Sequence, residues 1–309
     1  MWIMPQPLRP AALAAGDLVA LVAPSGPVPA DRADAAVGVL TGWGLRTRLG
    51  EHALGRAGYL AAGDEQRLAD LNAALRDPEV RAVLCLRGGY GVQRIVDRVD
   101  LDAVRADPKL LMGFSDITAL HLALWTETRL ATVHGPVAAQ FDKGAESPTA
   151  LGARLVLMGS TSVVVQADDP TTSGVRVPGR SAGPLLGGNL AMLASSLGTP
   201  HFPDLAGAIL LIEDVNEPPY KIDRMLTHLI RAGVLAGIAG IAVGQFTECE
   251  DGFGVGAAEV IAERLAPLGV PVLGGLPIGH GDQHVAVGLG VPAVLDAHAG
   301  TLEVAPVCR

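Results

Sequence analysis

The chain has 309 residues, of which 49% are hydrophobic and 18% charged, and a formal net charge of −9. This composition excludes a disordered chain, and the absence of any Lys/Arg-rich block argues against a nucleic-acid-binding protein. The longest hydrophobic run, residues 232–246, is too short and glycine-rich for a membrane span, and the N-terminus has no basic region typical of a signal peptide. Cys85, Cys249 and Cys308 have no metal-like spacing and fit a reducing compartment. We therefore expect a soluble cytoplasmic protein without a membrane or nucleic-acid partner.

Strand and helix patterns alternate through the first 145 residues. The expected elements, in chain order, are a strand and turn within 17–27, a helix over 30–42, a short strand at 45–49, a helix over 64–76, a strand at 80–86, a helix over 93–101, a strand at 109–112 and a helix from Ile117. This alternation predicts a parallel sheet with helices on both faces.

The pattern changes after about residue 145. Residues 147–181 hold short polar and β-branched runs and several prolines, as is typical of a connection between domains with some strand content. Beyond it, strands are expected at 208–212, 238–245 and 270–278, and helices at 222–232 and 257–265. We expect an N-terminal domain over 1–146, a connecting segment over 147–180 and a C-terminal domain over 181–309.

Ser115 stands between an apolar strand and a helical pattern, in the sequence Gly113-Phe114-Ser115-Asp116. A serine on such a turn can project its hydroxyl from the sheet, near the backbone N–H groups that open the helix. This is the layout of a nucleophile elbow, although Ile117 replaces the final glycine of G-x-S-x-G. The alternative is that Ser115 or Asp116 simply caps the helix.

A serine nucleophile needs a base, which histidine provides best near neutral pH, and a carboxylate that orients the imidazole. The carboxylate candidates are Glu213, Asp214 and Glu217, and the histidine candidates are His121, His134, His280 and His284. Glu213 directly follows a predicted buried strand, where α/β proteins place functional side chains. His280 lies in a glycine-flanked loop after an apolar run.

Simpler interpretations remain open for these residues. Glu213 could form a surface ion pair with Lys221 or Arg224. His280 and His284 are four residues apart, as in the zinc motif H-E-x-x-H, but Gly281 replaces the glutamate and the glycines disfavour a helix. We therefore expect neither a metal nor another cofactor.

Two glycine-rich segments could provide backbone N–H donors. Arg87-Gly88-Gly89-Tyr90-Gly91 follows a predicted strand and matches no phosphate-binding motif, so its other use is an oxyanion hole. Gly187-Gly188-Asn189 is either a second turn facing the same cleft or the start of a helix.

Taken together and in order, these segments resemble the LD-carboxypeptidase family, serine peptidases with a Ser-Glu-His triad that include the microcin C self-immunity hydrolases. The matching segments are Gly16-Asp17, 23–26, 59–64 with Arg67, Asp70 and Leu71, 87–91, 113–118, 134–136, 186–190, 213–224 and 279–281. Each segment alone is a weak signal, whereas the ordered set is specific and extends over the whole chain.

The resemblance implies Ser115 as nucleophile, His280 as general base and then acid, and Glu213 as the group that orients His280. It also implies an oxyanion hole formed by the backbone N–H groups of Gly89 and Asp116. It implies an α/β fold, in which a parallel-sheet domain carries Ser115, a swivelling-type α/β domain carries the other two residues, and the active site forms at their junction. Further candidates for contact with the substrate are Arg87, Gly88, Tyr90, His134 and Asn189.

The reaction implied is removal of the terminal D-Ala from the tetrapeptide of a muropeptide by a homodimer that needs no metal. A related hydrolase of aminoacyl-nucleotide amides is the alternative. It would need an aromatic platform, but Trp2, Trp43 and Trp125 all lie outside residues 147–181. A non-catalytic two-domain binding protein is the third alternative, and it would not require Ser115, Glu213 and His280 together.

Overall fold

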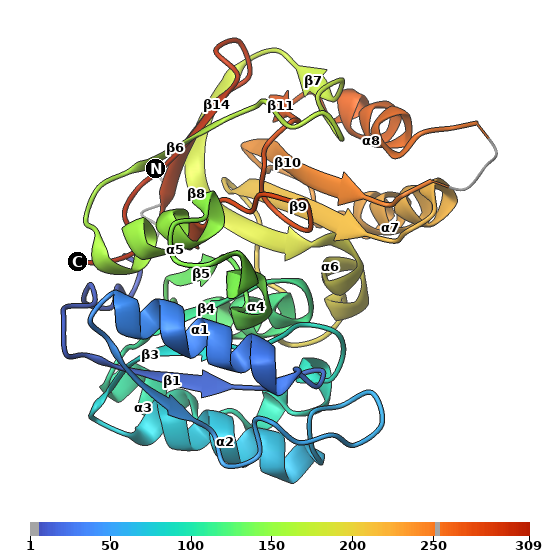
Figure 1. Ribbon diagram of the computed structural model, residues 1–309. Helices are drawn as coiled ribbons and strands as arrows, with labels where there is room; N and C mark the ends of the chain where they lie inside the picture. Colours follow the sequence, from blue (N-terminus) through green and yellow to red (C-terminus); the bar gives the residue numbers. More distant parts are fainter. Residues whose placement is uncertain (1–5, 251–253) are drawn as a thin grey trace. The chain divides into compact units, whose positions relative to one another are not determined.

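A computed structural model describes residues 6–250 and 254–309 (Figure 1). These residues divide into two compact units. The first comprises the described chain up to Thr161 with Ala286–Gly290 and Pro306–Arg309, and the second comprises Ser162–Val285 and Val291–Ala305. The chain thus passes from the first unit to the second after Thr161, whereas the sequence suggests a first domain that ends at residue 146.

The sheet of the first unit has the strand order β12-β5-β4-β3-β1-β2. Its strands are β1 (Leu18–Val22), β2 (Arg46–Leu49), β3 (Val80–Cys85), β4 (Leu110–Gly113), β5 (Thr132–His134) and β12 (Val287–Leu289). The pairs from β2 through β5 are parallel, and β12 runs antiparallel to β5. Every residue of β1 and β4 is buried, as expected for a parallel sheet covered on both faces.

Helices cover both faces of this sheet, which confirms the α/β prediction. The helices are α1 (Ala30–Gly42), α2 (Asp64–Arg76), α3 (Leu101–Ala106), α4 (Thr118–Thr128) and α5 (Pro148–Met158), with short 3₁₀ turns η1 (Val92–Arg94), η2 (Val96–Arg98), η3 (Ser115–Ile117) and η4 (Ala138–Lys143). The chain leaves β1 towards β2 and then returns past β1 to β3. Right-handed crossovers therefore place α1 on one face and α2 and α3 on the other (Figure 1). The strand order reverses between β1 and β3, and α/β proteins bind ligands beyond the carboxyl ends of strands at such a point.

Two expected elements of the first unit differ in the structure. The helix expected over 93–101 is replaced by η1, η2 and α3, because Asp100 accepts a hydrogen bond from Ala103 N–H and so begins a new helix at Leu101. The segment 147–180, expected to be mainly a connection, contains α5, whose start is capped by the Ser147 hydroxyl with Pro148 next to it.

The second unit is built on a mixed sheet with the order β6-β14-β13-β8-β9-β10-β11-β7. Its strands are β6 (Val163–Gln166), β7 (Arg176–Val177), β8 (Arg180–Asn189), β9 (Ile209–Val215), β10 (Gly240–Thr247), β11 (Val272–Leu273), β13 (Pro292–Asp296) and β14 (Thr301–Val304). Strands β8 to β11 are parallel. The helices α6 (Leu190–Ser196), α7 (Pro219–Arg231) and α8 (Ala257–Leu265) connect them, with the 3₁₀ turn η5 (Ala266–Leu268) after α8 (Figure 1).

Three sequence expectations are revised in this unit. Gly187 and Gly188 continue strand β8 instead of forming a turn, since they pair with Leu211 and Ile212 of β9. Strand β9 extends to Val215, so Glu213 lies within the strand and not after it. The strand expected over 270–278 is limited to β11.

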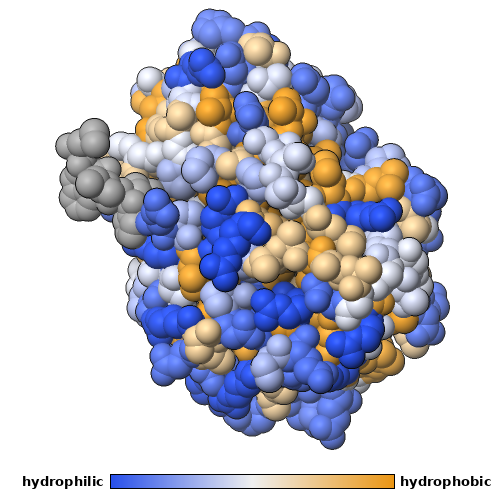
Figure 2. All heavy atoms as spheres, turned by 90° about the vertical axis from the view of Figure 1, so that its left-hand side faces the viewer, coloured by the Kyte–Doolittle hydropathy of each residue, from blue (hydrophilic) through white to orange (hydrophobic). Residues whose placement is uncertain are grey.

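On the face shown in Figure 2, hydrophobic residues are scattered among hydrophilic ones. Such scattering is normal for a folded chain and marks no single apolar surface there. No helix within residues 6–250 and 254–309 is long and apolar enough to cross a membrane.

Candidate active site

Ser115 occupies the sharp turn between β4 and η3. Its φ of 63° lies in the left-handed region, where a residue other than glycine is strained. The neighbouring residues Phe114 and Asp116 are buried, whereas Ser115 is partly exposed. A strained, accessible serine between a parallel strand and a helix has the geometry of a nucleophile elbow.

The interpretation of this turn as a simple helix cap is wrong. Within this described stretch, no side chain caps η3 or α4. The carboxylate of Asp116 instead accepts two hydrogen bonds at Oδ2, from Ser25 Oγ at 2.6 Å and from Val92 N–H at 2.9 Å. Burial raises the pKa of Asp116, and the two hydrogen bonds and the charge of Arg67 limit that rise.

The glycine-rich loop after β3 lies directly against Ser115. A Cβ on Gly88 would be 2.8 Å from Ser115 Cβ and 3.0 Å from Ser115 Oγ, so only glycine fits at this position. Gly89 follows it, is exposed and has a φ of 116°. The first unit therefore brings Gly88 into contact with the serine and places the Gly89 peptide next to that contact.

The side chains of the same loop point to different surroundings. Arg87 is exposed and donates from Nη1 to the Pro27 carbonyl at 2.8 Å. Tyr90 is 46% exposed, and its ring centroid lies 5.8 Å from that of Tyr59. Both residues are accessible to a small molecule, and their expected contact with the substrate stays a prediction.

The second unit joins Glu213 and His280 in a buried pair. His280 Nδ1 donates to Glu213 Oε2 at 2.6 Å, because the ionised carboxylate can only accept. The Glu213 side chain is fully buried, and that of His280 is 16% exposed. Burial by itself lowers the pKa of His280, but the charge of Glu213 and the hydrogen bond outweigh it and raise the pKa above its ordinary value.

Of the three carboxylate candidates, Glu213 accepts the hydrogen bond from His280. Glu217 is 3.5 Å from Lys221, and the Arg224 guanidinium lies 5.4 Å from the ring centroid of Tyr220. The surface ion pair considered for Glu213 is therefore formed by Glu217 instead. Glu213 can reach His280 because it lies in a buried strand of the same unit.

Two neighbours hold the His280 loop in place. Gly279 has a φ of 132°, and a Cβ there would be 2.7 Å from Glu213 Oε2. Gln245 Oε1 accepts from Gly281 N–H at 2.8 Å, while its Nε2 donates to Asp169 Oδ2 at 2.7 Å. Sequence reasoning did not identify Gln245. Its position at the end of a predicted strand could have indicated it, because α/β proteins place functional side chains there.

We expect Gly279→Ala to lower kcat by roughly 10- to 100-fold, because the added methyl group displaces Glu213 from His280. The matched control is Gly233→Ala, where φ is also positive at 74° but a Cβ meets nothing within 4 Å. Both variants should lose about 1–3 kcal/mol of stability from backbone strain, measured by denaturant unfolding. Equal loss of kcat in both variants would contradict this prediction.

Asn189 and Asp214 form a second polar pair beside Glu213. Asn189 Nδ2 donates to Asp214 Oδ1 at 2.8 Å, and Asn189 Oδ1 accepts from Met192 N–H at 3.1 Å. Asn189 thus caps α6, which confirms the interpretation of this segment as a helix start. Burial raises the pKa of Asp214 to about 7, and the charge of Glu213 contributes to the rise. The expected contact of Asn189 with the substrate stays a prediction.

The other three histidine candidates are buried in the core. His121 Nε2 is 2.9 Å from the Gly113 carbonyl, and burial lowers its pKa to about 3. His134 is fully buried in β5, and its ring contacts Phe114 edge-on at 5.8 Å between centroids. His284 is fully buried as well. The expectation that His134 faces the substrate stays a prediction.

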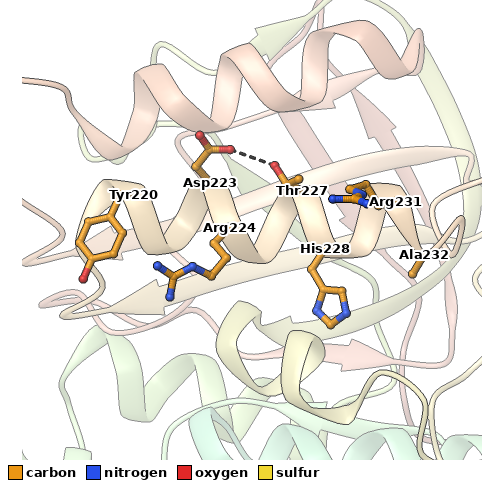
Figure 3. Close-up of a pocket in the computed structure, with 7 residues that line it drawn as sticks. All are labelled: Tyr220, Asp223, Arg224, Thr227, His228, Arg231 and Ala232. Carbon is orange, nitrogen blue, oxygen red and sulfur yellow. Dashed lines mark hydrogen bonds between the residues drawn. The ribbon is translucent and has the colours of Figure 1, made fainter.

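A hollow of about 690 Å³ lies on α7 and contains none of the predicted site residues. Its lining residues are Tyr220, Asp223, Arg224, Thr227, His228, Arg231 and Ala232 (Figure 3). Asp223 and Thr227 point to one side of the helix, where they are hydrogen-bonded at 3.0 Å, while Arg224 and His228 point to the other (Figure 3). These side chains lie along a single helix and offer no nucleophile beside a base.

Models of two protein-family domains match the chain. Residues 19–135 match the LD-carboxypeptidase N-terminal domain, and residues 182–295 match the LD-carboxypeptidase C-terminal domain. A Streptomyces coelicolor protein described as a putative carboxypeptidase is 48% identical over 96% of this chain and 95% of its own length. The murein tetrapeptide carboxypeptidase of Pseudomonas aeruginosa is 36% identical over 91% of this chain and 93% of its own.

Solved structures also match the chain over nearly its whole length. The crystal structure of muramoyltetrapeptide carboxypeptidase from Oxalobacter formigenes superposes with a TM-score of 0.82 at 31% identity, covering 93% of this chain and 97% of the other. The microcin C7 self-immunity protein superposes with a TM-score of 0.85 at 23% identity, covering 97% and 98%. The second match shows a shared fold.

Proposed function

The chain belongs to the LD-carboxypeptidase family and is a carboxypeptidase-type hydrolase, and from this premise we propose that Ser115, His280 and Glu213 act together as its catalytic triad. The observation that supports this most is the buried Glu213–His280 pair, with a 2.6 Å contact at Nδ1. A carboxylate bound to Nδ1 fixes the tautomer in which Nε2 can accept a proton.

In the proposed reaction, Ser115 Oγ attacks the carbonyl carbon of the scissile amide. Its proton passes to His280 Nε2, and the imidazolium that forms is stabilised by Glu213. His280 then gives the proton to the leaving amine, the C–N bond breaks and an acyl-enzyme remains. Water activated by His280 cleaves that ester and regenerates Ser115.

The negative charge on the carbonyl oxygen needs donors that are in place before the attack. We propose the backbone N–H groups of Gly89 and Asp116 for this role. The contact of Gly88 with Ser115 and the position of Asp116 directly after the nucleophile support it. Removing one such donor typically costs about 100- to 1,000-fold in kcat.

The proposed substrate is the tetrapeptide of a muropeptide, whose terminal D-Ala is released from the L-centre of a diamino acid. The relatives named murein tetrapeptide carboxypeptidase and muramoyltetrapeptide carboxypeptidase support this choice. The terminal carboxylate requires a cationic or N–H partner, and Arg87, which is exposed beside Gly88, is our candidate.

The test is incubation of the purified protein with L-Ala-γ-D-Glu-meso-diaminopimelyl-D-Ala and detection of free D-Ala by mass spectrometry. The same peptide ending in L-Ala serves as the stereochemical control. Release of D-Ala alone supports the proposal, whereas release of both or neither would contradict it.

Aspartyl sulfamoyl adenosine, which is bound by the microcin C7 self-immunity protein, serves as the second substrate in this assay. Trp43 and Trp125 are buried at 5% and 4% exposure, and Trp2 lies outside the described residues. Neither described tryptophan can therefore stack on an adenine ring, although Tyr59 and Tyr90 are exposed. Cleavage of this compound without D-Ala release would identify the chain as an aminoacyl-nucleotide hydrolase.

The activity should be lost at acid pH, with a midpoint above the ordinary histidine pKa of 6.5. The reason is that His280 must be neutral to accept the Ser115 proton, and Glu213 raises the pKa of His280. A pH profile of kcat/KM measures this midpoint. In Glu213→Gln the residual activity should have a midpoint at lower pH, and an unchanged midpoint would argue against His280 as the base.

We also propose, from the family resemblance, that the enzyme is a cytoplasmic homodimer. Analytical ultracentrifugation at assay concentrations tests the dimer, and fractionation of cells tests the location.

A further inference from the structure

The turn Ser25–Gly26 is hydrogen-bonded to both segments that carry the proposed oxyanion donors. We infer that the turn Ser25–Gly26, after β1, is a positioning element that orients the N–H groups of Asp116 and Gly89 for catalysis. This inference rests on the proposed function. It assigns a role to two residues that do not belong to the triad, the oxyanion hole or the candidates for substrate contact.

The first contact joins this turn to the residue that follows the nucleophile. Ser25 is fully buried, and its Oγ donates to Asp116 Oδ2 at 2.6 Å. Ser115 is strained at a φ of 63°, so its turn needs contacts that hold it in this conformation. Anchoring the Asp116 side chain fixes the backbone of the same residue, and with it the direction of its N–H group.

The second contact acts on the glycine-rich loop. Gly26 N–H donates to the Gly88 carbonyl at 3.1 Å. The peptide bond between Gly88 and Gly89 is trans and planar, so its C=O and N–H groups point in opposite directions. Gly26 therefore sets the plane of this peptide by binding its oxygen, and the Gly89 N–H on the other side is oriented in consequence.

Gly26 has little freedom to change. A Cβ there would be 2.9 Å from the Gly88 oxygen, which is a backbone atom and cannot rotate away alone. The methyl group of an alanine would push this oxygen and tilt the peptide that carries Gly89 N–H. The sequence Pro24-Ser25-Gly26-Pro27 thus combines a buried hydroxyl donor with the single residue type that fits against the loop.

Hydrogen bonds from Arg67 and Ala61 stabilise the turn Ser25–Gly26 and its neighbours. The buried side chain of Arg67 donates to the carbonyls of Pro24 and Gly91, and so connects the chain before the turn to the end of the glycine-rich loop. Ser25 also accepts a hydrogen bond from Ala61 N–H at 2.9 Å through its carbonyl oxygen. The turn lies where the strand order reverses between β1 and β3, so it reaches the loop after β3 directly.

The experiment compares Ser25→Ala and Gly26→Ala with the wild type. We expect kcat to fall roughly 10-fold in Ser25→Ala and roughly 100-fold in Gly26→Ala, while KM changes by less than about threefold. The matched control is Ser147→Ala, which removes a hydroxyl that caps α5 in the same unit. It should lower the melting temperature without changing kcat.

A second readout separates positioning from general damage. The probe is a peptide aldehyde of L-Ala-γ-D-Glu-diaminopimelate, whose carbonyl carbon bonds to Ser115 Oγ while the hydroxyl proton passes to His280, leaving an oxyanion. Its inhibition constant should rise in both variants by about the factor by which kcat falls. A structural role alone would leave the inhibition constant of the folded fraction unchanged.

The outcomes distinguish this inference from the proposed function. If Ser115→Ala is inactive while Ser25→Ala and Gly26→Ala keep kcat and aldehyde affinity within about twofold, the inference is wrong and the proposed function stands. If Ser115→Ala retains wild-type kcat, the proposed function fails first. Should Gly26→Ala not fold, Ser25→Ala, which only removes one oxygen, decides the question.

Discussion

Ser115→Ala is expected to lower kcat by about 10⁴- to 10⁶-fold, the largest effect predicted for any single substitution in this protein. Without Oγ no acyl-enzyme can form, and the remaining rate comes from substrate binding and the proposed oxyanion donors. The measurement is D-Ala release from the tetrapeptide under single-turnover conditions with excess enzyme.

The fold should survive this substitution. Ala and Ser both carry a Cβ, so both are strained at a φ of 63°, and the contacts of Asp116 with Ser25 and Val92 do not involve the Ser115 hydroxyl. The melting temperature should therefore differ from that of the wild type by only a few degrees, which corresponds to a change of about 1 kcal/mol in the free energy of unfolding. A variant that folds and retains more than about 1% of kcat would rule out Ser115 as the nucleophile.

Glu213→Gln is expected to lower kcat by about 10⁴-fold. The substituted amide would donate its N–H to His280 Nδ1, which forces the proton onto Nε2, the nitrogen that must accept the Ser115 proton. The full burial of Glu213 increases the effect, because no water can replace the lost acceptor.

Glu217→Gln is the matched control, because Glu217 is another of the three carboxylate candidates and lies just beyond strand β9, which contains Glu213. Glu217 lies 3.5 Å from Lys221 in a partly exposed pair, and such pairs are worth roughly 0–1 kcal/mol. Its kcat should stay within about twofold of the wild type. If Glu217→Gln loses activity and Glu213→Gln does not, the assignment of the orienting carboxylate is wrong.

Much of the active-site chemistry can be predicted from local sequence. The strand–turn–helix around Ser115 was predictable because an apolar run, a glycine and a helical pattern follow one another within about ten residues. The glycines at 87–91 could be associated with a backbone donor site for the same reason. The helix over 257–265 was predicted with the bounds that the structure shows.

Other features depend on which face of a strand a side chain occupies and on where a strand ends, and these could not be predicted from the local sequence. Glu213 and Asp214 are adjacent, but successive side chains of a strand point to opposite faces. Glu213 therefore pairs with His280, while Asp214 accepts from Asn189. The local pattern does not show which of the two acids faces His280, and the choice of Glu213 from the sequence rested on its place after the predicted strand and on the family resemblance. Likewise, the expected strand over 270–278 shortens to β11, and the chain beyond it forms the loop that carries His280.

The sequence by itself determined the order of elements in the first unit, the family and the residues with catalytic potential. The elements and the candidate residues follow from periodicity and motifs within short stretches, whereas the family follows from the order of the matching segments along the whole chain. The tertiary structure alone decided that β12, from residues 287–289, joins the sheet of the first 134 residues. It alone decided that Gly26 binds Gly88, which lies 62 positions further along the chain. Such contacts depend on which strands become neighbours, and that choice is made by the packing of the whole sheet, not by any local preference.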